Sequence, residues 1–452
     1  MDYSKLLAQA IADAAGLEVE DIASWIEVPA DETLGDYAFP CFKLAKTLRK
    51  APPAIAAEIA GKLVKPGFVS EVRVVGAYIN FFLDRVTLAR QTLEDVFEQG
   101  DAYGGSDKGA GRVVCIDYSS INIAKPFHIG HLSTTVIGNA LYRIYGFLGY
   151  KPVGINHLGD WGTQFGKLIV AYKLWGSKED IEARSITAML ELYVKFHEEA
   201  EKNPALDEQA RVWFKKIEDG DEEALSIFNW FKELTLKEVG KIYDLLGVHF
   251  DSYAGESFYN DKMQPVIDEL KEKGLLEFSE GAYVVRLGDD LPPCIVLKSD
   301  GATLYSTRDL AAAFYRKKTY NFHKCLYVVA YQQNLHFRQV FKVIELMGYD
   351  WAKDLEHVAF GMVSLEDGTL STRKGKVVLL KDVLDKAVEK TLSIIEEKSP
   401  GLENKEEVAK TVGIGAVVFD TLSSARIKDI TFSFDRVLNF DGETGPYVQY
   451  TH

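Results

Sequence analysis

Hydrophobic residues in the first part of the chain follow a helical period and then a strand-like one. Residues 2–15 place apolar side chains on one helical face and are followed by a glycine, where a helix would end. A second helix is expected in residues 52–65, because prolines suit its first turn and a further proline must follow its end. Residues 69–75 and 78–83 are β-rich, and a helix follows them. This pattern predicts a small α+β domain over residues 1–105.

The pattern changes after residues 99–111, whose glycines and aspartates favour a linker between domains. Short, mostly apolar segments then alternate with helical ones, and the expected strands are residues 112–118, 152–157, 325–330 and 357–363. Buried strands that alternate with helices are typical of a doubly wound parallel sheet. The fold class is therefore α/β, with a Rossmann-like sheet domain over residues 112–380.

Three stretches depart from this alternation. Residues 177–280 contain charged amphipathic helices, which predict a helical insertion in the sheet domain. Residues 294–307 contain two strand-like runs and predict a hairpin that turns at Asp300 and Gly301. Residues 381–452 are helical again and predict a C-terminal helical segment.

The composition of the 452 residues is that of a globular protein, with 47% hydrophobic and 26% charged residues. The formal net charge of −15 argues against a protein that coats nucleic acid non-specifically, although it allows a local basic groove. The four cysteines are far apart, which indicates free thiols in a reducing compartment. The N-terminus lacks a signal-peptide pattern, and no apolar run approaches the roughly 18 residues of a membrane span. We therefore expect a soluble, cytoplasmic protein with no membrane segment.

The most informative motif is His128-Ile129-Gly130-His131, which follows the first expected strand of the sheet domain and starts the next helix. Histidines one turn apart face the same way, and a helix N-terminus already offers free N–H groups to an anion. Two imidazoles there can hydrogen-bond a phosphate whose charge grows in a transition state, and Gly130 leaves room for a flat base. The alternative is a pair of surface or metal-binding histidines, for which the sequence offers no third ligand nearby.

The segment around this motif resembles a known family. Residues 117–132, D-Y-S-S-I-N-I-A-K-P-F-H-I-G-H-L, are similar to the first signature of class I arginyl-tRNA synthetases. The resemblance continues in order and spacing through residues 158–166, 304–311, 332–337, 361–363 and 370–376. It implies a ligase that forms arginyl-adenylate and pyrophosphate from ATP and arginine, and then transfers the arginyl group to the 3′ end of its tRNA. Two rivals stay open: another adenylyltransferase with an H-x-G-H motif, and a catalytically silent tRNA- or protein-binding relative.

The resemblance also implies which residues bind arginine. A guanidinium has only donors, so its pocket needs carboxylates and amide oxygens. The positions that match the family are Asp117, Asn122, Tyr305, Asp309 and Gln333. If the segment is helical, Tyr305 shares a face with Asp309 and its ring could stack on the guanidinium. Taken singly, Asp117 could be a turn cap, Asp309 a helix N-cap and Tyr305 a packing residue in a hairpin strand.

For ATP, the resemblance implies two groups of residues. The catalytic residues are His128, His131, Lys125 and Lys374, the last in the lysine-rich second signature S-T-R-K-G-K, and which lysine dominates stays open. The nucleotide-binding residues are Gly130, Gly159, Asp160, Trp161, His336, Met362 and Val363. Mg²⁺ is expected to accompany ATP as co-substrate, with no dedicated metal cage and no tightly bound cofactor.

The partner implied by the resemblance is the tRNA for arginine. Residues 1–105 match the family's additional domain, which touches the tRNA, and the catalytic domain spans residues 112–380. Basic candidates are Lys43, Lys46, Arg49 and Lys50, and again Arg316, Lys317 and Lys318, although such clusters are usually solvated helix faces. Residues 440–452 resemble the segment that leads into the family's helical anticodon-binding domain, so we expect a chain truncated before that domain. We also expect a monomer.

Overall fold

A three-stranded antiparallel sheet of order β1-β3-β2 lies at the centre of the first of two compact units, Met1–Gly105. Its strands are β1 (Tyr37–Pro40), β2 (Val69–Val75) and β3 (Tyr78–Leu83), and its helices are α1 (Tyr3–Ala15), α2 (Val19–Ala23), α3 (Ala45–Leu48), α4 (Pro52–Lys62) and α5 (Arg85–Gln99). Leu7 and Ile11 of α1 pack with Ile59 of α4 in the core. The predicted α+β unit is confirmed, and β2 and β3 have the predicted limits.

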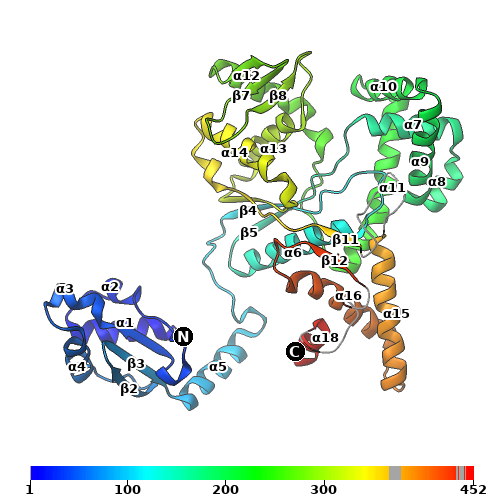
Figure 1. Cartoon of the computed structure of the whole chain (residues 1–452). Helices are drawn as coiled ribbons and strands as arrows, with labels where there is room; N and C mark the ends of the chain where they lie inside the picture. The colour runs from blue at the N-terminus through cyan, green and yellow to red at the C-terminus, as the bar shows by residue number, and fades with distance from the viewer. Residues whose placement is uncertain (1, 366–377, 434–435, 437–441, 443) are drawn as a thin grey trace. The chain divides into compact units, whose positions relative to one another are not determined.

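The structure is a computed structural model, and it describes residues 2–365, 378–433, 436, 442 and 444–452 (Figure 1). The second unit, Ser106–His452, holds a four-stranded parallel sheet of order β10-β9-β4-β5. Its strands are β4 (Val113–Asp117), β5 (Lys151–Ile155), β9 (Lys324–Tyr327) and β10 (Leu355–His357). The prediction of a Rossmann-like parallel sheet is confirmed. The strand order changes direction between β4 and β9, and open α/β sheets bind ligands at such a point.

Strand β4 is buried on both faces, as expected for a central parallel strand. Val114 and Ile116 belong to an apolar cluster that includes Val136 of α6 (Leu132–Phe147). Cys115 belongs to a second cluster, with Leu310 of α13 (Tyr305–Tyr320) and residues of α14 (Asn334–Leu346). Helices therefore cover both faces of the sheet, and the ends of β4 and β9 open between them.

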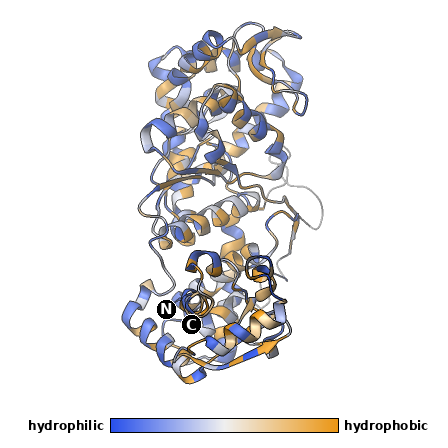
Figure 2. Ribbon diagram, turned by 90° about the vertical axis from the view of Figure 1, so that its left-hand side faces the viewer, coloured by the Kyte–Doolittle hydropathy of each residue, from blue (hydrophilic) through white to orange (hydrophobic). Residues whose placement is uncertain are grey.

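Five helices lie in residues 177–280, for which the sequence predicts a helical insertion: α8 (Lys178–Arg184), α9 (Ile186–Lys202), α10 (Ala205–Glu218), α11 (Glu222–Leu246) and α12 (Met263–Glu272). The described part of the second unit also contains α7 (Thr163–Trp175), α15 (Leu380–Lys398), α16 (Lys405–Ser423) and α18 (Gly445–Thr451). Figure 2 shows hydrophilic and hydrophobic turns on the same helices, the pattern of helices with one buried face. Among the described residues, no helix is both long and apolar enough to cross a membrane.

The hairpin predicted at residues 294–307 is only half present. Strand β8 (Cys294–Lys298) joins a small antiparallel sheet with β6 (Leu276–Ser279) and β7 (Ala282–Val285). After the turn, Thr303 makes a single bridge to Leu297, and α13 then begins at Tyr305. The second strand is missing because the Leu304 N–H donates to Thr307 Oγ1, 3.3 Å away, which caps a helix at that point.

The strand predicted at residues 357–363 is wrong, because this segment connects two strands that belong to different sheets. Strand β10 ends at His357, while β11 (Val363–Leu365) pairs in parallel with β12 (Ile430–Phe432). The chain turns between them past Gly361, where a Cβ would lie 2.0 Å from the carbonyl oxygen of Lys428. The apolar run of residues 357–363 therefore contains a glycine at which two backbone segments cross too closely for any side chain.

Candidate active site

A cavity of about 430 Å³ opens where β4 and β9 end. The residues predicted to bind arginine all line it: Asp117, Asn122, Tyr305, Asp309 and Gln333. Gly159 and His336, predicted for the nucleotide, line it as well. These side chains come from the end of β4 and the loop after it, from the loop after β5, and from α13 and the start of α14. The fold thus brings together residues as far apart in the sequence as Asp117 and His336.

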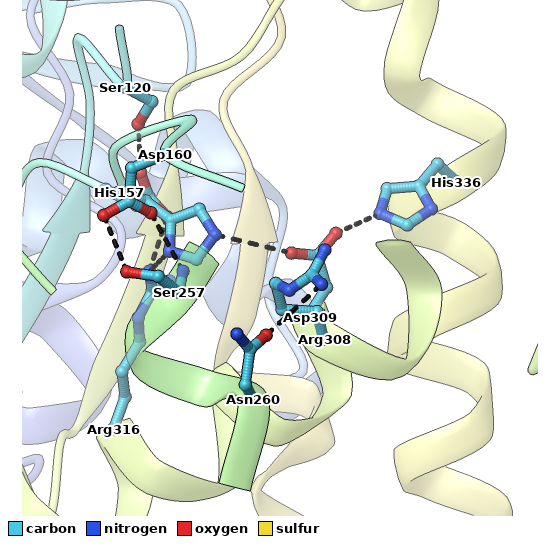
Figure 3. Close-up of polar contacts among 10 residues, drawn as sticks. Ser120, His157, Asp160, Ser257, Asn260, Arg308, Asp309, Arg316 and His336 are labelled. Atoms are coloured by element: carbon cyan, nitrogen blue, oxygen red, sulfur yellow. Dashed lines mark hydrogen bonds and ion pairs between the residues drawn. The ribbon is translucent and has the colours of Figure 1, made fainter. Parts of the chain in front are cut away.

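Asp309 projects from α13 between two histidines (Figure 3). His336 Nε2 lies 2.5 Å from Asp309 Oδ2, and His157 Nε2 lies 4.0 Å from Asp309 Oδ1. Burial alone would raise the pKa of this carboxyl, but the His336 hydrogen bond and the nearby charge of Arg316 hold it below its ordinary value. The cavity therefore contains an ionised carboxylate. The alternative of a helix N-cap is wrong, because α13 begins one turn earlier.

Asp117 is paired with a cation of the protein itself. Arg316 Nη2 donates to Asp117 Oδ2 over 2.7 Å, and only 1% of Arg316 and 6% of Asp117 are exposed. The second carboxylate oxygen accepts from Ser120 Oγ at 2.7 Å. Arg316 is therefore not part of a tRNA-facing basic cluster with Lys317 and Lys318, and that prediction is wrong for Arg316. Its face of α13 turns inward.

Glu256 is a cavity residue that the sequence did not suggest. It begins the short helix η5 (Glu256–Lys262), and its N–H donates to the Leu158 carbonyl at 2.9 Å. Burial and the neighbouring carboxylates, Asp309 and Asp160, raise its pKa to about 7, although the Arg308 charge opposes them. Its segment has no period or motif that marks it. Long-range packing alone places the side chain.

Tyr305 lies one helical turn before Asp309, not in a hairpin strand. The centroid of its ring lies 4.8 Å from that of the His336 ring, and the residue, which lines the cavity, is 62% exposed. Asn122 is also exposed and forms a parallel bridge with Gly159. A Cβ on Gly159 would lie 2.3 Å from Asn122 Oδ1, so a larger residue there would push the Asn122 amide out of its present position.

The two motif histidines face each other at the start of the helix after β4. Their ring centroids are 4.0 Å apart, and the 3-10 turn Ile129–His131 leads directly into α6. His128 Nδ1 accepts the Gly130 N–H at 3.1 Å, and His131 Nδ1 accepts the His128 N–H at 3.2 Å. Burial and the Lys125 charge together lower the pKa of His128 to about 4, and burial, the neighbouring His128 and the Lys125 charge lower the pKa of His131 to about 3. At neutral pH both rings are uncharged, so each keeps its proton on Nε2.

The other residues predicted for the nucleotide lie around the cavity rather than in its lining. Asp160 is fully buried, and its carboxylate accepts from Lys232 Nζ at 2.6 Å. It also accepts from the N–H and the hydroxyl of Ser257, at 2.9 and 2.8 Å (Figure 3). Trp161 packs edge-on against Phe214. Asp160 therefore has its hydrogen bonds satisfied within the protein.

Met362 and Val363 lie near the motif helix instead. The Met362 N–H donates to Asp429 Oδ1 at 2.7 Å, and Val363 lines a small hollow with Ile129. Lys374, predicted to be catalytic, lies outside the residues that the structure describes. Within the described part of the chain, no three histidine, cysteine or acidic residues are grouped so that they could hold a metal ion.

The comparisons with known proteins agree with this geometry. Residues 92–434 match the family described as tRNA synthetases class I (R), catalytic domain, and residues 1–83 match the arginyl tRNA synthetase N terminal domain. The arginine–tRNA ligase of Alkaliphilus metalliredigens is 59% identical over 450 residues, which cover 98% of this chain and 80% of that protein. The arginine–tRNA ligase of Clostridium perfringens is 57% identical over 453 residues, with the same 80% of its length covered.

A solved structure supports the same relationship. Thermus thermophilus arginyl-tRNA synthetase matches with a TM-score of 0.79 and 26% identity, covering 99% of this chain and 80% of that one. Whether a further domain follows residue 452, as expected from the sequence, stays a prediction. The identity over nearly the whole chain is far above what is needed to establish kinship, and this chain belongs to the arginyl-tRNA synthetase family.

Proposed function

We propose that this protein is an arginine–tRNA ligase that forms arginyl-adenylate in the cavity at the ends of β4 and β9. The observation that carries this proposal is the meeting of five predicted arginine-binding residues in one cavity. The substrates are then ATP, arginine and the tRNA for arginine. The proposed reaction has two steps, adenylate formation with release of pyrophosphate and transfer of the arginyl group to the tRNA.

The guanidinium of arginine is bound by Asp309 and Glu256. Both carboxylates line the cavity, and a guanidinium presents its donors in a planar fork that suits carboxylate oxygens. A bound cation would favour the ionised form of Glu256, which burial disfavours in the empty cavity. Tyr305 offers a ring face to the same group. Asp117 contributes indirectly, since its charge is already neutralised by Arg316.

The phosphates of ATP are bound by His128, His131 and Lys125. Because both Nδ1 atoms accept backbone N–H groups, the Nε2–H groups are the donors left for a ligand. Such donors act on the oxygen atoms of the α-phosphate as the arginine carboxylate attacks the phosphorus and pyrophosphate departs. Lys125 adds a positive charge close to both rings. Asp160 holds the loop that carries Gly159 and Trp161 rather than touching the nucleotide.

Mg²⁺ is expected to enter with the ATP polyphosphate. The described residues around the cavity offer no carboxylate cage for it, and Mg²⁺ commonly keeps water and phosphate ligands in such sites. We propose further that residues 1–105 contact the tRNA, that residues 177–280 are an insertion in the catalytic domain, and that the protein works as a cytoplasmic monomer. Lys43, Lys46, Arg49 and Lys50 stay the candidates for tRNA contacts in the first unit.

The test is ATP–pyrophosphate exchange with arginine, run with and without arginine tRNA, next to calorimetric titration with arginine and with ATP. Exchange that depends on arginine and is absent with lysine or citrulline supports the proposal. Exchange with a different acid would favour another adenylyltransferase. Binding of tRNA without any binding of arginine or ATP would favour a silent relative and would contradict the proposal.

A further inference from the structure

The loop after β4 has an unusual backbone. Ser119, Ser120 and Ala124 have φ angles of 67°, 43° and 59°, in the left-handed region that residues with a side chain avoid. Strain of this kind persists only where the surroundings fix it. The loop ends at Lys125, three residues before His128 of the motif, so whatever fixes its backbone also sets the direction in which Lys125 leaves it.

Helix α11 holds this loop at both ends. The Ala124 N–H donates to Thr235 Oγ1 at 3.1 Å, and the Tyr243 hydroxyl lies 2.7 Å from Ser119 Oγ. Thr235 and Tyr243 are eight residues apart, a spacing that puts them on one face of a helix. Thr235 is fully buried, and its own proton goes to the Phe231 carbonyl at 2.8 Å. Its hydroxyl is therefore used twice, once as a donor along the helix and once as an acceptor from the loop.

A third contact extends the same face of α11 to the neighbouring loop. Lys232, one turn before Thr235, donates to the buried carboxylate of Asp160 at 2.6 Å. A single helix outside the sheet thus fixes the loop after β4 and the loop after β5. Together these two loops carry Lys125, Asn122 and Gly159.

We propose that Thr235 is a positioning residue for adenylate formation, which holds Ala124 so that Lys125 stands beside the motif histidines. This inference rests on the proposed function, in which Lys125, His128 and His131 bind the phosphates. Lys125 lies close enough to the two imidazoles for its charge to lower the pKa of both. A shift of the Ala124 amide would move that charge away from the reacting phosphate.

The arginine side of the loop is held separately. Asn122 bridges Gly159, the Gly159 N–H donates to the Ile121 carbonyl at 2.8 Å, and the Ile123 N–H donates to the Gly159 carbonyl at 3.1 Å. Loss of the Thr235 acceptor should therefore disturb Ala124 and Lys125, which precede the proposed phosphate site, and leave Asn122 in place beside the proposed arginine site. This separation predicts a change in kcat rather than in the KM for arginine.

The experiment compares Thr235→Val, which keeps the shape and removes the hydroxyl, with Thr235→Ser, which restores the acceptor. Thr391→Val is the matched control, because Thr391 of α15 is also buried and also donates to the carbonyl one turn back, that of Ala387, at 2.8 Å. The activity is arginine-dependent ATP–pyrophosphate exchange with arginine tRNA present. Hydrogen exchange of the peptide covering residues 119–127 reports on the loop in the same samples.

We expect Thr235→Val to lower kcat by about 10–100-fold, the usual scale for a small misplacement of a catalytic group. The KM for arginine should stay within about threefold, and Thr235→Ser should recover most of the activity. Hydrogen exchange over residues 119–127 should quicken in Thr235→Val but not in Thr391→Val. A kcat in Thr235→Val no lower than in Thr391→Val would overturn the inference, as would unchanged hydrogen exchange in the loop.

Lys125→Ala separates this inference from the function beneath it. If Lys125→Ala loses exchange activity and Thr235→Val does not, the positioning role is wrong and the proposed phosphate site stands. If neither variant loses activity, the proposed role of Lys125 is itself wrong, and the positioning role of Thr235, which depends on it, is wrong as well.

Discussion

Arg316 Nη2 lies 2.7 Å from Asp117 Oδ2 and 3.4 Å from His157 Nδ1. Arginine can only donate, so His157 Nδ1 must accept, and the imidazole proton then sits on Nε2, the atom that faces Asp309. The internal guanidinium thus neutralises one carboxylate of the site and orients a donor toward another. One arginine of the chain thus shapes the cavity in which we propose that the substrate arginine binds.

The Arg316–Asp117 pair gives a prediction about stability. Arg316→Met would leave the buried Asp117 carboxylate without its partner, and removal of one member of a buried pair typically lowers the free energy of unfolding by about 3–5 kcal/mol. The double variant with Asp117→Asn should lose clearly less, because no buried charge remains unpaired. Urea unfolding of the wild type, Arg316→Met and the double variant measures these differences in the free energy of unfolding. Arg184→Met, which breaks an exposed pair with Asp180, is the control and should leave the midpoint nearly unchanged.

Asp309 should determine specificity for a charged side chain. Asp309→Asn keeps the shape and removes the charge, so discrimination between arginine and its uncharged isostere citrulline should shrink by about 2–5 kcal/mol. The ratio of kcat/KM for the two amino acids in pyrophosphate exchange measures it. Asp300→Asn, in the exposed turn after β8, should leave the ratio unchanged. If Asp309→Asn lowered only thermal stability, the carboxylate would be structural.

His131 should act on the chemical step. Its Nε2–H is proposed to bind phosphate in the transition state, so His131→Ala should lower turnover by about 10²–10³-fold and leave arginine binding nearly intact. Single-turnover adenylate formation and calorimetry with arginine separate the two effects. His323→Ala, at a histidine that stacks on Tyr150 outside the cavity, is a suitable control. Weaker arginine binding with an unchanged chemical step would contradict the assignment.

The elements of this fold could be predicted from sequence wherever local patterns decide them. The limits of β2 and β3 and the start of α4 follow from apolar period and proline, and these positions agree with the structure. The pattern is misleading at residues 357–363, where one apolar run connects strands of two different sheets. It is also misleading after Gly301, where a capping hydrogen bond marks the start of a helix and no second strand of a hairpin forms.

Long-range packing sets the features of the site that the sequence did not reveal. Arg316 stands next to Lys317 and Lys318 in the sequence, and the three look like one basic cluster. In the structure Arg316 is buried on the inward face of α13, together with Leu310 and Ala313. The spacing of three residues between them is one that helical periodicity could have revealed. Glu256 offers no such signal. Its segment is held against β5 and the loop after it by the bridge between Ser252 and Ile155 and by the hydrogen bond from the Glu256 N–H to the Leu158 carbonyl.

Glu256 gives a prediction about pH. Its pKa is raised to about 7 in the empty cavity, so the carboxyl is partly protonated at neutral pH and fully ionised only above it. An ionised Glu256 binds a guanidinium better than a neutral one, so kcat/KM for arginine should rise with pH through about 7 and then level off. Glu256→Gln should lower kcat/KM and remove this rise. Glu403→Gln, on an exposed loop, should keep the wild-type profile.

Ionisation of the Glu256 carboxyl, which should favour arginine binding, should lower the free energy of unfolding. The folded-state pKa, about 7, lies above the ordinary value of 4.5, so the stability linked to this carboxyl is fully present below pH 4.5 and is lost as pH rises through 7. Glu256→Gln stays neutral, and at pH 8.5 it should therefore unfold with a free energy about 1–3 kcal/mol higher than the wild type, while the two converge near pH 5. Denaturant unfolding at both pH values without arginine measures this. Two results would contradict these assignments. One is a Glu256→Gln protein that is less stable than the wild type at pH 8.5. The other is a Glu256→Gln protein whose kcat/KM for arginine still rises with pH, and either result would mean that Glu256 interacts with a group other than the substrate.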